Sequence, residues 1–182
     1  MKYDVIIAGG DPADVKIAMA ALAAGKSCCL IAEGRLSGEG GRNAFAQAGG
    51  VLLLGDRVSS VEWAEDGSVA ALYTANLGDE RLVASVYVLA TGRFFTKGLV
   101  STMDSIREPL FGCDVLFEAD RSRWCVEDFF APQPFESFGV KVDEDQHPLK
   151  QGKAIVNLLA AGGILAGRVD NTEEICRKIL SA

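Results

Sequence analysis

The strongest constraint on the fold lies in the first 33 residues, where buried-strand and helix patterns alternate. The run from Tyr3 to Ala8 is apolar after one polar residue, as in a strand buried on both faces of a parallel sheet. Pro12 to Ala24 has apolar residues near the helical period, and Gly25 follows as a C-cap glycine. Cys28 to Ala32 is a second buried strand. This opening predicts a β–α–β unit and an α/β fold with a parallel sheet.

The middle of the chain has a weakly patterned stretch followed by short strand patterns. Residues 34 to 41 show no periodicity and predict a flexible connector, and Asn43 to Ala48 predicts a short helix. Three strand patterns then predict a three-stranded β-meander: Val58 to Ala64, Val69 to Ala75 and Glu80 to Ser85. Val86 to Ala90 follows as a further buried strand and ends in Thr91 and Gly92.

The last third of the chain is less regular and is rich in aromatic residues and proline. We predict a hairpin from Gly139 around Asp143, a buried strand from Ile155 to Ala160 and a helix from Glu173 to Leu180. A chain of 182 residues fits one domain with a genuine core.

Charge and composition exclude several classes of function. The net charge of −7 argues against binding to nucleic acid or to an anionic membrane, because both need a cationic surface. No apolar run approaches the roughly 20 residues that span a bilayer, and the N-terminus enters a strand pattern directly, so we expect a cytoplasmic protein. The five cysteines and the single histidine have no metal-ligand spacing, so we predict no metal site. The neighbours Cys28 and Cys29 should point to opposite faces of their strand.

The turn after the first strand is where a dinucleotide-binding fold carries the motif G-x-G-x-x-G. Glycines there allow the tight turn, the close approach of the pyrophosphate and the close contact between helix and strand. Gly9 keeps the first of the three glycine positions, whereas Asp11 and Asp14 stand at the second and third. A carboxylate about 5 Å from a phosphate at an effective dielectric near 20 costs roughly 3 kcal/mol, or about two decades of affinity.

Asp11, Pro12 and Asp14 also form a near-copy of a capping box, at N-cap, N1 and N3. We predict that the two carboxylates satisfy the free amides of the helix and take the electrostatic place of a pyrophosphate. The alternative is a tolerated variant loop that still binds a dinucleotide such as FAD in an altered pose. Glu33 follows the second strand, where an acidic residue takes ribose hydroxyls, although a glutamate in that place can also be merely solvated.

Several segments resemble the FAD-dependent oxidoreductase family. They are Tyr3 to Ile7 with Gly9-Gly10, Leu54 to Val58, the predicted meander, and Val88 to Gly92. Further segments resemble the family of B subunits of anaerobic glycerol-3-phosphate dehydrogenases: Arg107 to Val115, Asp128 to Pro134 and Phe138 to Val140. The similarity extends from Leu52 to Gly167 and over the first 33 residues.

The resemblance implies one Rossmann-like FAD/NAD(P)-binding domain over residues 1–182, with a central parallel sheet and a three-stranded β-meander. Residues 1–33 are its β–α–β unit, and residues 34–50 are a connector that replaces a cap or substrate region. Residues 51–182 hold the meander, the strand ending in Ala90-Thr91-Gly92, and the C-terminal part.

The resemblance also implies where FAD lies, if it binds. The implied cofactor-binding residues are Gly9, Gly10, Glu33, Val58, Ala90, Thr91, Gly92 and Gly162. Val58 contacts the adenine through its backbone, and Ala90, Thr91 and Gly92 lie beside the diphosphate and ribose. Gly162 stands where the family closes the flavin site with a glycine–aspartate pair, but the acid is absent from Ala161-Gly162-Gly163. As an alternative, Val58 is a core valine and Thr91-Gly92 is a strand-ending turn.

No catalytic residue follows from the sequence. His147 lies in a predicted exposed hairpin, which favours a solvated turn histidine over a proton carrier. Arg93, Arg107 and Glu108 either hold an anionic substrate such as a phosphate ester or form structural salt bridges. We expect Trp63 and Trp124 to be packing residues.

Two functions of different classes remain open. The first is a flavin-dependent oxidoreductase or flavoprotein subunit that acts on glycerol 3-phosphate or a similar compound, in which a weakly bound FAD carries the hydride. The second is a non-catalytic Rossmann scaffold that has lost FAD, for example a docking partner of other dehydrogenase subunits. A nicotinamide-binding module is a third interpretation, which the altered loop disfavours equally.

Overall fold

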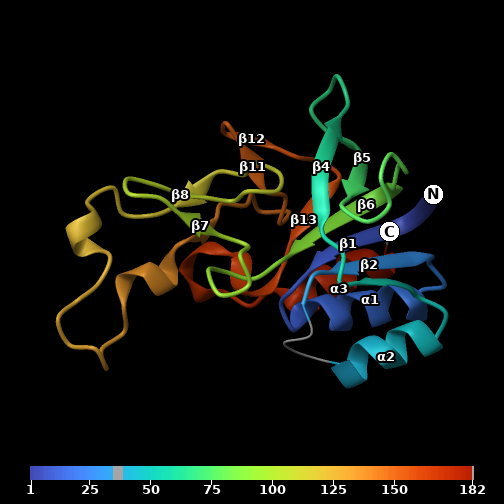
Figure 1. Cartoon of the computed structure of the whole chain (residues 1–182), viewed down its shortest axis with the longest axis horizontal. Coiled ribbons are helices and arrows are strands. Elements are labelled where there is room, and N and C mark those ends of the chain that lie inside the picture. Colours follow the sequence, from blue (N-terminus) through green and yellow to red (C-terminus); the bar gives the residue numbers. More distant parts are fainter. Residues whose placement is uncertain (35–38, 182) are drawn as a thin grey trace.

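A five-stranded parallel sheet forms the centre of the molecule (Figure 1). The computed structural model describes residues 1–34 and 39–181. In sheet order the strands are β13 (Leu158–Ala160), β6 (Val83–Ala90), β1 (Lys2–Gly9), β2 (Cys28–Ala32) and β3 (Val51–Leu54). Every neighbouring pair in this sheet is parallel. The predicted α/β class with a Rossmann-like sheet is confirmed, and β3 is a sheet strand that the sequence pattern did not predict.

Helices cover one face of the sheet (Figure 1). The helices are α1 (Ala13–Ala23), α2 (Glu39–Gln47) and α3 (Thr172–Ser181). Ile7 and Cys28 point into the core beneath α1 and α3, whereas Ile6 and Cys29 point into the opposite core. The two neighbouring cysteines therefore face opposite sides of the sheet, as predicted, and burial raises the pKa of each to about 12.

The predicted connector is partly helical. Its residues 35–38 lie outside the described part of the chain, but α2 already begins at Glu39, earlier than the predicted helix from Asn43. The fully buried Phe45 joins the core beneath α1 and α3. The segment between β2 and β3 therefore contributes packing as well as a connection.

The predicted three-stranded meander is only partly present. β4 (Val58–Trp63) and β5 (Val69–Thr74) form the expected antiparallel hairpin on the other face of the sheet (Figure 1). The predicted third strand is not separate, because Val83 and Ala84 pair with Lys2 and Tyr3 and so begin β6. A bridge between Leu72 and Leu82 joins β5 to this segment. The predicted third strand was wrong because β1 offers a longer parallel partner than β5 does.

The loop-rich part packs on the same face as the hairpin. Its short elements are β7 (Val100–Ser101), β8 (Ile106–Arg107), β9 (Val115–Leu116), η1 (Arg121–Arg123), η2 (Pro134–Ser137), β10 (Gly139–Val140), β11 (Leu149–Lys150), β12 (Lys153–Ala154), η3 (Gly162–Ile164) and η4 (Ala166–Arg168). Trp63 and Trp124 pack in this core, as expected.

The predicted hairpin around Asp143 is present, because Val142 and Pro148 form an antiparallel bridge and the Leu149 amide donates to the Lys141 carbonyl at 3.0 Å, while β10 at its start pairs with β9. The turn itself is present, since the Asp143 amide donates to the His147 carbonyl at 3.0 Å. Within the described residues, no helix is long and apolar enough to cross a bilayer.

Candidate functional site

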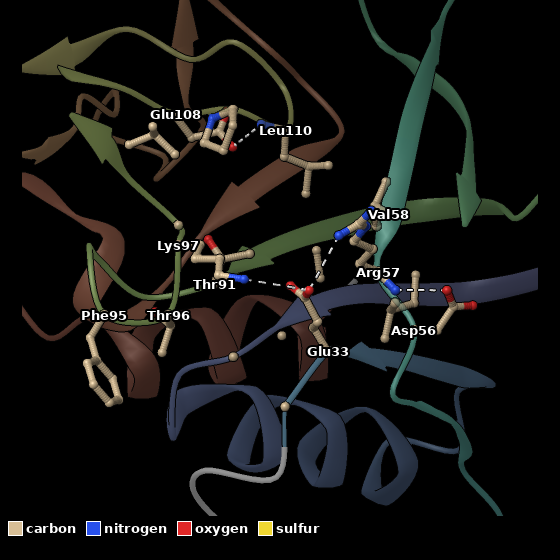
Figure 2. A pocket seen from close by; sticks show the side chains of 18 of the residues that line it. Glu33, Asp56, Arg57, Val58, Thr91, Phe95, Thr96, Lys97, Glu108 and Leu110 are labelled. Carbon is tan, nitrogen blue, oxygen red and sulfur yellow. Dashed lines mark hydrogen bonds and ion pairs between the residues drawn. The ribbon is translucent and has the colours of Figure 1, made fainter. Parts of the chain in front are cut away.

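A cavity of about 470 Å³ opens at the carboxyl ends of β1, β2 and β6 (Figure 2). Successive strands β1, β2 and β3 run to one side of the sheet, and β6 lies on the other side of β1. Open α/β sheets bind ligands at such a point, where the strand order reverses. The volume lies within the range of small-molecule sites. The position therefore makes this cavity the candidate ligand site.

The structure brings together five of the eight cofactor-binding residues predicted from the sequence. Gly9, Gly10, Glu33, Val58 and Thr91 all line the cavity. The remaining three lie around the first turn of α1 instead. The carbonyl of the buried Ala90 accepts from the Asp11 amide at 3.0 Å, and Gly92 and Gly162 lie against the Asp11 side chain.

The Asp11 carboxylate occupies a hollow at the N-terminus of α1. Its Oδ1 accepts from the Ala13 amide at 3.0 Å, and its Oδ2 accepts from the Gly163 amide at 3.1 Å. The helix begins at Ala13, one residue later than predicted, with Pro12 at the cap position. Asp11 therefore accepts a hydrogen bond from an amide of the first helical turn, as predicted, although it stands one residue before the N-cap position and not at it.

The Asp14 carboxylate is buried beside the glycine turn and is paired with a cation. Its Oδ2 accepts from the Gly10 amide at 3.0 Å and from the Arg42 guanidinium at 2.7 Å. The predicted capping box required Asp14 to accept from the Asp11 amide, and this was wrong because that amide donates to Ala90. Burial raises the pKa of Asp14, while Arg42 and the Gly10 amide oppose the rise.

Gly9 is required by the position of Asp14. A Cβ on Gly9 would lie 2.5 Å from Asp14 Oδ2 and 2.7 Å from Leu30 Cδ1. The one glycine of the motif that survives at its expected position therefore makes room for a carboxylate of the chain itself.

Glu33 lies at the end of β2 with its carboxylate between two cations of the cavity wall (Figure 2). Its Oε1 lies 3.6 Å from Arg57 Nη1 and 3.9 Å from Lys97 Nζ. All three side chains are exposed, so these pairs are weak and easily exchanged for a ligand. The carboxylate remains accessible as a hydrogen-bond acceptor.

Buried polar atoms without a partner among the described residues gather at this site. Three of them are Asp14 Oδ1, Arg42 Nε and Thr91 Oγ1. Arg42 and Thr91 both line the cavity. Because a buried polar atom without a hydrogen bond is costly, these atoms indicate that the site is completed by something it binds, water included.

The residues considered for substrate binding have structural contacts instead. Arg93 donates to the backbone carbonyls of Gly163 and Leu165. Glu108 is buried, and its carboxylate accepts from three backbone amides, at Leu110, Phe111 and Cys113. Burial raises the pKa of Glu108, and the three amides oppose the rise. We predicted a salt bridge or a substrate contact for Glu108. Instead, both of its carboxylate oxygens accept hydrogen bonds from backbone amides.

The other two candidates lie apart from the cavity wall. Arg107 is exposed on β8. His147 is half-buried in its turn, with Nδ1 3.4 Å from Asp143 Oδ2.

Arg42 is the functional residue that sequence reasoning missed. One signal was available, because Asp14 lies on the same helical face as the buried residues Ile17, Ala18 and Ala21. An acid on a buried face requires a partner, usually a cation. The identity of that partner depends on how α2 packs against α1, which a single sequence does not reveal.

The parallel sheet, the glycine turn and the cavity at the strand ends define a dinucleotide-binding α/β domain. Residues 33–178 match the family described as FAD binding domain, and the chain belongs to that family. FAD is the cofactor, and flavoprotein oxidoreductase the functional class, that the family indicates.

Comparison with curated proteins identifies relatives with a common name. The chain is 42% identical over 125 residues to the B subunit of anaerobic glycerol-3-phosphate dehydrogenase from Vibrio vulnificus (strain CMCP6), covering 68% of this chain and 28% of that protein. It is 43% identical over 126 residues to the protein of the same name from Yersinia pestis bv. Antiqua (strain Antiqua), covering 69% and 30%. The chain thus spans less than a third of the length of these relatives.

A solved structure shares the fold over nearly the whole chain. The open conformation of a flavocytochrome c3 fumarate reductase matches with a TM-score of 0.60, covering 98% of this chain and 76% of that chain. The sequence identity is 11%, so this likeness shows the fold alone.

The residues present fit one part of FAD and not another. The cavity offers Glu33 and Val58 to a nucleoside. At the turn, however, the amides of Gly10, Ala13 and Gly163 already donate to the carboxylates of Asp14 and Asp11. A diphosphate needs those donors free, and it would also meet the carboxylate charge. The turn therefore does not fit the diphosphate.

Proposed function

We propose that this chain is a subunit of a glycerol-3-phosphate dehydrogenase-like oxidoreductase and that it binds FAD weakly or not at all. Its role is then that of a Rossmann scaffold within a larger assembly, and glycerol 3-phosphate or a similar compound is the substrate of that assembly. The partners are other dehydrogenase subunits. Support for this comes from the likeness to proteins named as the B subunit of such a dehydrogenase.

One observation carries the proposal of weak FAD binding. The amides of Gly10 in the turn, Ala13 at the start of α1 and Gly163 in η3 are each paired with a carboxylate of the chain at 3.0–3.1 Å. An incoming diphosphate has to displace those carboxylates or bind beside them, and either event costs free energy.

The test is the flavin content of the purified protein. After expression with excess riboflavin, the visible spectrum and the flavin released on denaturation give the FAD-to-protein ratio. We expect a ratio far below one and weak binding of added FAD. One FAD per chain after gel filtration would overturn the proposal.

The second candidate is a flavin-loaded oxidoreductase, favoured by the family match and by the open cavity. It predicts a yellow protein that reduces a redox dye when glycerol 3-phosphate is added. The same flavin measurement separates the two candidates, because only this one requires bound FAD.

The domain organisation and location belong to the same proposal. We take residues 1–182 as one FAD/NAD(P)-binding-type domain, in which residues 34–50 stand in place of a cap region. A cytoplasmic location is supported by the cysteines, which are free in the described residues and suit a reducing compartment. We assign no catalytic residue.

A further inference from the structure

The segment between η1 and η2 extends away from the central sheet (gold to orange in Figure 1). We call its residues 125–133 the aromatic arm. Residues 125–130 of the arm are all exposed, and they include Phe129 and Phe130, with 83% and 94% of their surface in solvent. Single exposed apolar side chains are common, but two neighbouring aromatic rings that are almost fully solvated form a patch typical of a contact with another molecule.

Both ends of the aromatic arm are fixed to the hydrophobic core. The buried Trp124 precedes the arm, and its indole Nε1 donates to the Glu118 carbonyl at 2.6 Å. The Trp124 ring meets the Phe138 ring edge to face, with the ring centroids 5.9 Å apart. Just beyond the arm, the Phe135 amide donates to the Trp124 carbonyl at 3.0 Å, so the two ends lie side by side. The arm is therefore a closed loop on a rigid base.

Hydrogen bonds inside the aromatic arm fix how it presents its two rings. The Gln133 side chain spans the loop, since its Oε1 accepts from the Val126 amide at 2.9 Å and its Nε2 donates to the Asp128 carbonyl at 2.8 Å. Asp128 Oδ1 accepts from the Phe130 amide at 3.0 Å. The rings of Phe129 and Phe130 meet edge to face, with centroids 5.6 Å apart. Because the loop is already ordered, binding through these rings costs little conformational entropy.

The charges on the aromatic arm indicate which partner it fits. Glu127 and Asp128 directly precede the two rings, and neither forms an ion pair within the described part of the chain. Arg123, a cation close to them in sequence, is paired with Asp120 at 3.4 Å. The arm therefore presents aromatic rings beside negative charges that the chain does not compensate, and a complementary surface is apolar at its centre and cationic at its rim.

The same charges disfavour two other occupants. An anionic lipid surface repels Glu127 and Asp128. A second copy of the chain that docks through the same surface brings its own Glu127 and Asp128 against these carboxylates, and juxtaposed like charges oppose association.

We propose that the aromatic arm is a docking element, which inserts Phe129 and Phe130 into an apolar pocket of a partner protein whose rim carries lysine or arginine side chains. The two rings supply the apolar contact at the centre of the interface. Glu127 and Asp128 pair with the cations at its rim. This inference rests on the proposed function for the identity of the partner, which is then another subunit of the same dehydrogenase assembly.

Photo-crosslinking in the cells that make the protein tests the contact and identifies the partner. The photoreactive amino acid p-benzoyl-phenylalanine replaces Phe130 in one version of the chain and Phe95 in the control, because Phe95 is also 83% exposed but lies on another segment. We expect position 130, and not position 95, to crosslink to a dehydrogenase subunit, at a site next to lysine or arginine. No crosslink from position 130, or the same crosslinks from both positions, would overturn the proposal. A crosslink from position 130 to phospholipid or to a second copy of the chain would also overturn it.

Isothermal titration calorimetry with the crosslinked protein, purified as the binding partner, measures what each side chain contributes. Phe129→Ala and Phe130→Ala should each weaken binding by about 30-fold or more, as expected for anchors at the centre of an interface. Glu127→Gln should weaken binding by up to about 5-fold at low salt and by less at high salt, because a charge at the rim is screened. Phe95→Ala is the matched control and should leave the affinity unchanged. Thermal melts verify folding, and an unchanged affinity in a folded chain that carries both Phe129→Ala and Phe130→Ala refutes the docking role.

The outcomes separate this inference from the proposed function. If dehydrogenase subunits bind the wild-type chain and the Phe129→Ala, Phe130→Ala chain equally well, the proposed function stands and the docking role of the aromatic arm is removed. If position 130 crosslinks to a cation-rimmed pocket of a protein that is no dehydrogenase subunit, the docking role stands and the proposed assembly is removed. The flavin content of the purified protein bears on the proposed function alone.

Discussion

The buried pair of Asp14 and Arg42 gives the sharpest test of how the turn is stabilised. Both side chains are almost fully buried, with 1% and 3% of their surface exposed. Asp14→Asn leaves the Arg42 guanidinium without a counter-charge, and arginine does not lose its proton in proteins. Breaking one side of such a pair costs about 3–5 kcal/mol of unfolding free energy. Because the pKa of Asp14 is raised in the folded protein, the wild-type protein loses some stability as the pH rises from the unfolded pKa to the folded one, so the deficit of Asp14→Asn should decrease over that range and be constant above it.

Arg42→Met should behave differently, because a carboxyl group can become neutral. Burial already raises the pKa of Asp14, and Arg42 opposes that rise, so its removal raises the pKa further. A folded-state pKa above the unfolded value means that the folded protein binds the proton more readily. Relative to the wild-type protein, whose Asp14 pKa is also raised, the deficit in stability is therefore small at low pH and grows as the pH rises from the folded pKa of the wild-type protein to the higher folded pKa of the variant. The slope is at most about 1.4 kcal/mol per pH unit.

Urea denaturation followed by tryptophan fluorescence measures both variants at about pH 5 and about pH 8. Arg42→Met also loses a hydrogen bond to the Gly34 carbonyl, which adds a constant cost. Arg177→Met is the control, since that arginine is exposed. A deficit for Arg42→Met that does not change with pH, or a cost below about 1 kcal/mol for Asp14→Asn, would refute this account of the pair.

Three further perturbations test the surrounding structure. Asn171→Ala should lower the free energy of unfolding, measured by urea denaturation, by about 2–3 kcal/mol, because the buried Asn171 side chain accepts from the Gly162 amide and donates to the Ala160 carbonyl. Asn43→Ala is the control, since Asn43 is exposed. Equal losses in the two variants would contradict this role of Asn171. Gly9→Ala should lower the melting temperature by several degrees, since the new Cβ would lie 2.5 Å from Asp14 Oδ2, and an unchanged melting temperature would show that Asp14 lies elsewhere. In the native protein a thiol reagent at neutral pH should modify the exposed Cys125 quickly and the buried Cys28 hardly at all, because burial raises the pKa of Cys28 to about 12. Peptide mass spectrometry measures both rates, and rapid modification of Cys28 would contradict the prediction.

Much of the fold was predictable because it depends on local pattern. The apolar runs of β1 and β2, the helical period of α1 and the glycine at position 25 each specify an element within a few residues. The short strand β3 escaped prediction because Val51 to Leu54 is half exposed at the sheet edge. The start of β6 was misassigned because two strands compete to pair with it, and the sequence does not rank them.

Like the fold, the candidate site was only partly predictable from the sequence. The sequence alone determined that the glycine turn carries Asp11 and Asp14, and it placed Glu33 at the end of β2. Only the tertiary structure decided what those acids do. Arg42 reaches Asp14 from α2, and the Gly163 amide reaches Asp11 from a segment 152 positions away. The physical reason is that a turn and a helix depend on neighbouring residues, whereas the neutralisation of a buried charge depends on which distant segments pack beside it.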